Sequence, residues 1–400
     1  MIDTISAMAT SNSGGERKSS SSSSSSSSLP IGFFLSVLLP ISIAVGVVLY
    51  RLDPFDPAPF PEHEFFQEAG AVAQPRRVNG RMMQGAEFVG NGQLRLPEDI
   101  VYDPSLGVLY TGCADGWINR VTVNESASDS AVEKWVNTGG RPLGLALNHQ
   151  NHELIVADAV KGLLKITKDK EVILLSDEAE GQKFGLTDGV DVAKDGTIYF
   201  TDASSKYGLE NHLRDSCESR PYGRLLSFDP TTGLTKVLRR RLYFPNGVAV
   251  SPDQTSVIFC ETPLKRCRRY RMEGGDGNGT IERFIDNLPG LPDNVHYDGE
   301  GHYWIAIFTS FPPYASKLMK YRLVRKIMKI AERHTGRLID VLKKDGGAVA
   351  VDLEGNPSFH FYDSAALSIT SGVKIADHLY LGSVSYQHII RVNLARLSAS

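Results

Sequence analysis

The chain has 400 residues, of which 42% are hydrophobic, and its formal net charge is −3 at pH 7. Such a chain can bury a large core, and a charge so close to zero gives no reason to expect a nucleic-acid partner. The content of 37 Gly and 20 Pro suits a β protein with many turns.

The N-terminal part predicts a membrane anchor. Residues 1–28 end in an unbroken serine run and are expected to form a disordered cytoplasmic tail. Residues 29–50 are apolar and uncharged, and a helix of this length spans a bilayer core of about 30 Å. Because Arg17 and Lys18 precede it, we expect an uncleaved signal anchor of a single-pass type II protein, with the rest of the chain lumenal. The alternative is a cleaved signal peptide.

After a Pro-rich linker at residues 51–80, the domain at residues 81–400 contains a sequence repeat. Six segments each begin with a small or polar residue and continue with alternating apolar residues: 98–102, 143–147, 188–192, 246–250, 293–297 and 371–375. Most are followed by a turn and a second apolar strand. Short strands repeating about every fifty residues predict an all-β fold, a six-bladed β-propeller.

The leading residues of these segments predict a metal site. In a propeller the first strand of each blade lines the central channel, so the leading residues gather near one mouth. They are Glu98, Leu143, Asp188, Asn246, Asp293 and Ser371, with Asn294 beside the fifth. Crowded carboxylates repel one another unless a cation lies among them, and hard oxygen ligands suit Ca²⁺. We therefore predict a Ca²⁺ site formed by Glu98, Asp188, Asn246, Asp293 and Asn294. The alternative is that each is an ordinary turn residue.

Two insertions, at residues 204–222 and 310–347, fall between second and third strands, so both are expected to cover this mouth. The longer one contains an amphipathic helix. Its apolar side has Met319, Leu323, Ile327 and Ile330, and its basic side has Arg322, Lys326, Lys329 and Arg333. We expect a lid helix that packs through its apolar side and leaves its basic side in solvent. The alternative is a helix that lies on a membrane surface.

Two further features suit a lumenal domain. Asn124 and Asn278 each begin a sequence that fits an N-glycosylation site. Cys260 and Cys267 lie at adjoining ends of two predicted hairpin strands, close enough for a disulfide. Free thiols at both positions remain the alternative.

The motifs at residues 96–99, 186–192, 198–205, 244–253 and 291–295 resemble the strictosidine synthase-like proteins of plants. That family is related to the adipocyte plasma membrane-associated proteins, the paraoxonases and the gluconolactonases. The resemblance implies a six-bladed propeller, Ca²⁺-dependent ester or lactone hydrolysis, and a membrane of the secretory pathway such as the endoplasmic reticulum or vacuole. It places Glu98, Asn246, Asp293 and Asn294 at metal-ligand positions, whereas Thr187 replaces the usual Asn.

Departures from the related families limit the chemistry. Residues 368–372 contain no acid where strictosidine synthase has its catalytic Glu, so true strictosidine synthesis is not expected. Residues 156–159 contain no His where the paraoxonases have a pair. The base must then be Asp188 or Asp293, or Asp158 if its side chain reaches the channel. Two functions remain open: a Ca²⁺-dependent hydrolase of small esters or lactones, or a non-catalytic propeller that binds a small molecule or precursor and contains structural calcium.

Overall fold

The computed structural model describes residues 34–60, 74–148, 150–272, 279–310, 313–335 and 345–399, which belong to two units, Met1–Asp53 and Pro54–Ser400. In the first unit, η1 (Phe34–Leu38) continues into α2 (Leu39–Leu52). The stretch Leu35–Leu52 is long and apolar enough to cross a membrane. The start of the predicted anchor and the serine-rich tail lie outside the described residues.

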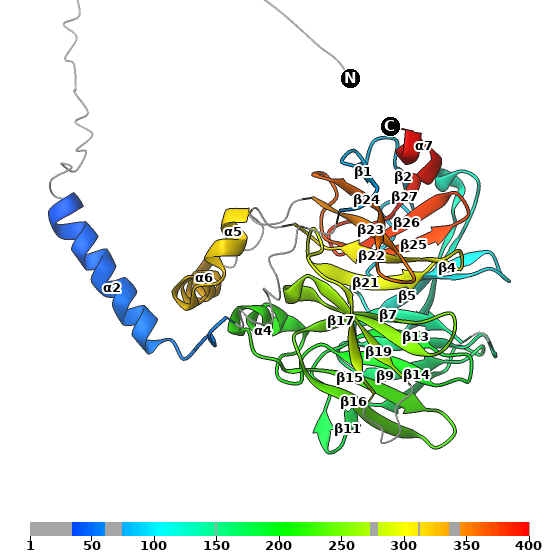
Figure 1. Cartoon of the computed structure of the whole chain (residues 1–400), viewed down its shortest axis with the longest axis horizontal. Helices are drawn as coiled ribbons and strands as arrows, with labels where there is room; N and C mark the ends of the chain where they lie inside the picture. Colours follow the sequence, from blue (N-terminus) through cyan, green and yellow to red (C-terminus); the bar gives the residue numbers. More distant parts are fainter. Residues whose placement is uncertain are drawn as a thin grey trace, which may run out of the picture. The chain divides into compact units, whose positions relative to one another are not determined.

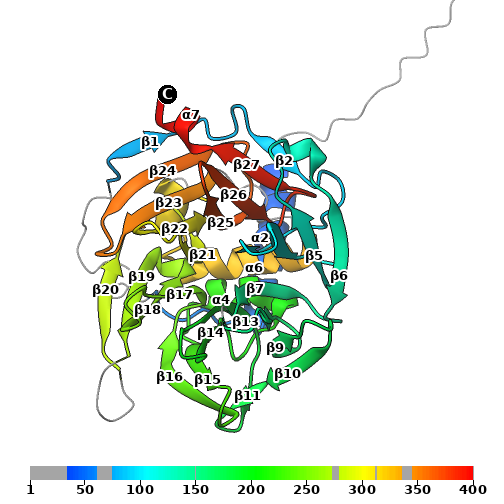
Figure 2. The same cartoon turned by 90° about the vertical axis from the view of Figure 1, so that its right-hand side faces the viewer.

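The second unit is a six-bladed β-propeller, as the repeat predicts (Figures 1 and 2). Figure 2 looks through the ring and shows β7, β13, β17 and β21 near its centre. From the inside outward, blade one consists of β3 (Ile100–Asp103), β4 (Val108–Gly112), β5 (Trp117–Thr122) and β6 (Val132–Asn137). Blade two consists of β7 (Pro142–Leu147), β8 (Leu154–Asp158), β9 (Gly162–Ile166) and β10 (Val172–Ser176). Blade three consists of β13 (Thr187–Val192), β14 (Ile198–Asp202), β15 (Gly223–Asp229) and β16 (Leu234–Leu242). Blade four consists of β17 (Pro245–Val250), β18 (Ser256–Glu261), β19 (Arg266–Arg271) and β20 (Ile281–Ile285). Blade five consists of β21 (Pro292–Tyr297), β22 (His302–Ile307), β23 (Gly346–Asp352) and β24 (Pro357–Asp363). Blade six consists of β25 (Ile369–Ile375), β26 (His378–Ser383), β27 (Ile389–Asn393) and β2 (Glu87–Val89). A small ribbon of β11 (Glu178–Ala179) and β12 (Gln182–Lys183) follows blade two in the sequence, belongs to neither adjoining sheet, and contacts β16 of blade three.

The ring is closed by both ends of the folded chain. β2 comes from the start of the unit and pairs antiparallel with β27 near its end, with Val89 opposite Ile389. The preceding strand β1 (Arg77–Asn79), within the stretch assigned to the linker, adds to the outside of blade five by parallel pairing with β24. Asn79 also donates to the carbonyl of Leu397 in α7 (Leu394–Ala399). Sheet closure of this kind leaves few strand edges unpaired.

Apolar side chains of neighbouring blades form the core between the sheets. One cluster joins Ile258 of blade four with Val295, Ile305 and Val349 of blade five, and all four side chains are buried. Burial on both faces explains the nearly continuous apolar sequence of second strands such as β4, β8 and β22. The same packing fixes where along the channel axis each inner strand begins. It therefore also fixes the positions of the leading residues.

Both insertions leave the propeller at the channel end where the inner strands begin. The first contains η3 (Leu209–Asn211) and α4 (His212–Glu218), and it follows Asp202, which pairs with Thr187. The second contains α5 (Pro313–Leu318) and α6 (Arg322–Thr335), and it follows Ile307, which pairs with Pro292. Figure 1 shows α4 and α6 on the same face of the propeller, and in Figure 2 α6 crosses behind the ring.

The expected orientation of α6 is wrong. Arg325 is 0% exposed and Lys329 is buried, whereas Leu323 and Ile327 are 55% and 51% exposed. The buried side is set by Arg325, whose guanidinium donates to three places: the carbonyl of Cys217 (2.9 Å), the hydroxyl of Ser219 (2.7 Å) and the carbonyl of Ala58 (2.6 Å). Charge-assisted bonds of this number can hold a buried cation that periodicity alone assigns to solvent.

Replacing Arg325 tests this arrangement. Arg325→Ala leaves the buried carbonyls of Cys217 and Ala58 without their donor, so we expect a loss of roughly 2–4 kcal/mol in the local stability of residues 54–60 and α4. Hydrogen exchange measured by mass spectrometry reports this loss as faster exchange in both segments. Lys317→Ala is the control, because Lys317 is an exposed cation of the preceding helix α5. Equal protection in the two variants would show that Arg325 does not hold the segments together.

Candidate functional site

The inner strands share an irregularity at the level of their leading residues. The pairing register with the second strand shifts between Pro142 and Leu145, Thr187 and Val190, Pro245 and Val248, Pro292 and Val295, and Ile369 and Ser371. An interrupted register of this kind changes the direction of the side chains next to it. In five blades, therefore, the side chains near the leading residue change direction at the same level of the channel.

Glycines next to the leading residues bring neighbouring inner strands into close contact. A Cβ atom on Gly144 would lie 2.4 Å from the carbonyl oxygen of Asp188, and one on Gly189 would lie 2.5 Å from that of Asn246. A Cβ on Gly247 would lie 2.5 Å from the Cα of Asn294. Each glycine is thus required because its strand packs against the leading residue of the next blade.

Threonine hydroxyls hold the same backbone from β14, from the turn after β18, and from β25. Thr201 donates to the carbonyl of Asn246 (2.7 Å), and Thr262 donates to that of Pro292 (2.8 Å). Thr370 donates to the carbonyl of Glu98 (2.6 Å). These bonds join blades three to four, four to five and six to one, so the adjacent blade holds the backbone at Asn246 and Glu98 and at Pro292, the residue before Asp293.

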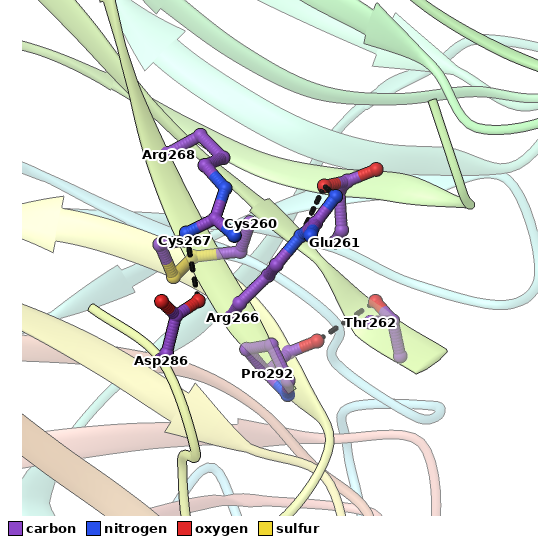
Figure 3. Close-up of a disulfide and its surroundings, with 8 residues drawn as sticks. All are labelled: Cys260, Glu261, Thr262, Arg266, Cys267, Arg268, Asp286 and Pro292. Carbon is purple, nitrogen blue, oxygen red and sulfur yellow. Dashed lines mark hydrogen bonds and ion pairs between the residues drawn. A yellow bond between two sulfur atoms is a disulfide. The ribbon is translucent and has the colours of Figure 1, made fainter. Parts of the chain in front are cut away.

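A disulfide lies directly behind one of these threonines. Cys260 and Cys267 are joined in the structure, and they close the short turn η4 (Thr262–Leu264) that carries Thr262 (Figure 3). Figure 3 also shows Thr262 bonded to Pro292, the residue before Asp293. The disulfide therefore stiffens the support of the strand that begins with Asp293.

The glycine contacts make a direct prediction. Gly247→Ala forces its new methyl group against the backbone of Asp293 and Asn294, so we expect a destabilisation of roughly 1–3 kcal/mol. Gly372→Ala is the control on another inner strand, since its methyl group would meet only ordinary contacts at 3.6 Å or more. Urea unfolding of both variants measures the difference. A control as unstable as Gly247→Ala would mean that close packing at the mouth is not the cause.

Three of the predicted ligands have buried oxygens that lack a partner. Among the described residues, none donates a hydrogen bond to Glu98 Oε2, Asn246 Oδ1 or Asp293 Oδ1. The second oxygen of Glu98 accepts from the side-chain amide of Asn294 at 3.0 Å. Buried oxygens of this kind are costly without a donor or a cation. They come from blades one, four and five.

The pKa shifts in this cluster have a common cause. Burial raises the pKa of Glu98 well above its usual value, and the charges of Asp293, Asp99 and Asp188 raise it further. Burial and the charge of Asp188 act in the same way on the pKa of Asp293, and burial with the charge of Asp99 raises the pKa of Asp188 to about 7. The buried guanidinium of Arg141 lowers the pKa of Glu98 and Asp188 but does not cancel these effects. Arg141 therefore opposes the crowded acids at Glu98 and Asp188.

These residues fit a calcium ion. In the described part of the chain, no three His, Cys, Asp or Glu side chains converge closely enough to hold a metal ion by themselves. The oxygens without partners belong instead to two acids and one amide, all hard ligands of the kind that Ca²⁺ prefers. Asp188 adds negative charge beside them, and Asn294 orients Glu98.

Removing divalent cations should make stability depend on pH. In a chelator, folded Asp188 keeps its proton up to about pH 7, whereas an unfolded Asp loses it near pH 4. The folded state then binds more protons than the unfolded state between these values, so stability falls as pH rises. We expect the thermal midpoint in chelator to drop from pH 5 to pH 8, and Ca²⁺ to remove the drop. Asp188→Asn should make the drop in chelator smaller, and the raised pKa values of Glu98 and Asp293 account for the part that remains. A midpoint independent of pH and Ca²⁺ in the wild type would contradict the cluster.

Sequence reasoning missed a second cluster in the channel. Asp99 Oδ1 accepts from His296 Nε2 and Ser371 Oγ, both at 2.7 Å. Burial alone would lower the pKa of His296, but the charge and hydrogen bond of Asp99 outweigh it and raise the pKa. Because Nε2 donates to Asp99, it cannot accept the proton of Ser371, although the two atoms are 3.2 Å apart. The cluster therefore is not a serine-nucleophile triad. Strand alternation from Asn294 to His296 was the signal that could have found it.

Two other features do not belong to the channel site: the candidate base Asp158 and a groove between two blades. Asp158, considered as a base, accepts from the hydroxyl of Thr138 and from the backbone of Arg141, Val160 and Lys161, so it braces a turn. A groove of about 640 Å³ lies between β16, the outer strand of blade three, and the strands β18 and β19 of blade four. Two of its arginines already have partners, Arg266 with Glu261 and Arg268 with Asp286 (Figure 3).

Comparisons with known proteins agree with the motifs. Residues 79–121 match the family model "Strictosidine synthase-like, N-terminal", and residues 188–275 match "Strictosidine synthase". Strictosidine synthase-like 6 of Arabidopsis thaliana is 47% identical over 92% of this chain and 96% of its own length. The chain belongs to the strictosidine synthase-like family. Adipocyte plasma membrane-associated protein of Gallus gallus is 32% identical over 90% of this chain and 89% of its own.

Solved structures support the fold of this family member. A gluconolactonase from Xanthomonas campestris covers 82% of this chain and 99% of its own with a TM-score of 0.56 at 16% identity. A calcium-binding regucalcin from Agrobacterium tumefaciens covers 79% and 94% with a TM-score of 0.53, also at 16% identity. At this identity the likeness establishes the propeller fold alone.

Proposed function

We propose that this strictosidine synthase-like protein is a Ca²⁺-dependent hydrolase of small esters or lactones. The observation that carries the proposal is the set of three buried oxygens without partners, on Glu98, Asn246 and Asp293, contributed by three blades to one channel mouth. The gluconolactonase and the calcium-binding regucalcin with the same fold support both halves of the proposal.

In this proposal, some residues of the channel mouth bind the Ca²⁺ ion and others transfer protons. Glu98, Asn246 and Asp293 would hold the ion, and Asn294 keeps the Glu98 carboxylate oriented. A bound Ca²⁺ would polarise the substrate carbonyl and stabilise the negative charge that develops on its oxygen. Asp188, with a pKa raised to about 7, is suited to accept a proton from water near neutral pH, and Asp293 is the second candidate for this role.

Synthesis of strictosidine is not part of the proposal. The last blade offers hydroxyls where that reaction needs a carboxyl group. Thr370 donates to the carbonyl of Glu98, and Ser371 donates to Asp99, so both hydroxyls serve as braces. Neither can shuttle protons as a carboxyl group does.

We also propose that α2 anchors the protein in a membrane of the secretory pathway, the endoplasmic reticulum or the vacuole, as a type II protein with a lumenal propeller. The length and apolar character of Leu35–Leu52 support the anchor, as does the name of the adipocyte plasma membrane-associated relative. An exposed Asn124 and the Cys260–Cys267 disulfide suit an oxidising lumen. Asn278, the second glycosylation candidate, lies outside the described residues.

Asp293→Asn tests the function. It removes one of the anionic ligands while conserving shape, so we expect at least a tenfold weaker Ca²⁺ affinity in calorimetry, because affinity falls with ligand charge. Hydrolysis of a panel of aryl esters and lactones should fall with it. Asp195→Asn is the control, since it removes the same charge from an exposed turn at the other end of an inner strand.

The outcomes separate the two functions left open by the sequence. Weaker Ca²⁺ binding together with lost turnover supports the hydrolase. Ca²⁺ binding that depends on Asp293 without turnover of any ester or lactone favours a non-catalytic binding propeller with structural calcium. Unchanged affinity in Asp293→Asn would refute the metal site itself.

A further inference from the structure

The outward side of α6 is apolar. Leu323 and Ile327, one helical turn apart, are both more than half exposed, on the side opposite the buried Arg325 and Lys329. Tyr314, Leu318 and Tyr321, from α5 and the turn after it, are exposed as well. We call these five residues the α5–α6 face: Tyr314, Leu318, Tyr321, Leu323 and Ile327. By contrast, the exposed Leu106 lies in a turn and the exposed Leu234 at the start of β16. A group of large exposed apolar side chains marks a contact surface.

Charge distinguishes this segment from the rest of the protein. Residues 313–335 contain seven Lys or Arg residues and a single acid, Glu332, although the whole chain has a net charge of −3. Lys317, Arg322 and Arg333 are exposed beside the apolar side chains. An apolar stripe bordered by basic residues is typical of helices that lie at the level of anionic lipid headgroups.

The chain also limits how far this face can be from a membrane. Arg322 donates to the carbonyl of Pro57 (2.7 Å) and pairs with Asp56 (2.8 Å), and Arg325 holds Ala58. Leu52, the last residue of α2, precedes Asp56 by only four residues. Four extended residues span at most about 14 Å. If α2 crosses a bilayer, Asp56, which the side chain of Arg322 at the start of α6 contacts, therefore lies within that distance of the point where the chain leaves α2.

We propose that the α5–α6 face is a second membrane contact, lying among the headgroups of the bilayer that α2 crosses. The proposal rests on the anchor proposed above. Since α5 and α6 follow Ile307, which pairs with Pro292 next to Asp293, this contact turns the channel mouth toward the membrane surface.

Depth-dependent quenching tests the contact in the full chain, reconstituted in vesicles of phosphatidylcholine with about one third phosphatidylserine. A fluorophore is attached through Leu323→Cys or Ile327→Cys, and through Leu234→Cys as control. Leu234 is 68% exposed, and it follows the end of β15 that points away from the mouth. Val47→Cys in α2 reports the anchor. The unpaired Cys113 and Cys217 are buried and shielded from the label.

We expect nitroxide-bearing lipid to quench the labels at positions 323 and 327 several-fold more than the label at position 234. Quenching at position 47 with none at 323 and 327 would overturn the proposal and leave the anchor intact. No lipid quenching at position 47 would refute the anchor, and the proposal with it. A label at 323 that is shielded from aqueous iodide but not quenched by lipid would mean that a protein covers the face, which also overturns the proposal.

Discussion

The packing of the inner strands brings buried acids together at one end of the channel, and the rest of the site depends on this crowding. Burial raises the pKa values of Glu98, Asp188 and Asp293, and the charges of neighbouring acids raise them further, whereas Arg141 opposes this rise at Glu98 and Asp188. Such a cluster is unfavourable in a folded protein unless a cation or protons compensate it. The glycines that allow close strand contact and the threonines that brace the leading residues all act to keep the acids at this distance.

The sequence predicted the elements that follow from repetition. Six copies of one pattern required six inner strands, and identical phase in the repeat placed Glu98, Asp188, Asn246 and Asp293 at one level. Alternation and turn residues carry this information locally, so no tertiary contact was needed to obtain it. The positions of both insertions followed from the same alternation of strand direction.

Features that depend on distant partners were not accessible in this way. The burial of Arg325 results from carbonyls at Ala58 and Cys217, more than a hundred residues away in sequence, and periodicity shows that a helix has two faces without showing which is covered. The Asp99, His296 and Ser371 cluster likewise joins blades one, five and six. Asp99 was overlooked because its neighbour Glu98 leads the segment, although both are acids at the start of β3.

Both insertions and the N-terminal connection meet at the mouth end of the propeller, where α4 and α6 share Arg325 with residues 54–60. The oxygens that lack partners therefore lie at the end of the channel from which both insertions leave the propeller. In a propeller, the blades supply a rigid scaffold, and the loops at one mouth adapt it to a ligand. In this protein, the blades thus hold the candidate ligands in place, and the insertions lie around the mouth at which a ligand would bind.

The most direct test of the account is a crystal structure of the protein grown with Ca²⁺, with the ion located by its anomalous scattering. The account predicts one ion within about 2.3–2.6 Å of Glu98 Oε2, Asn246 Oδ1 and Asp293 Oδ1. Absence of an ion at saturating Ca²⁺, with these three oxygens bonded to protein donors or water instead, would contradict it.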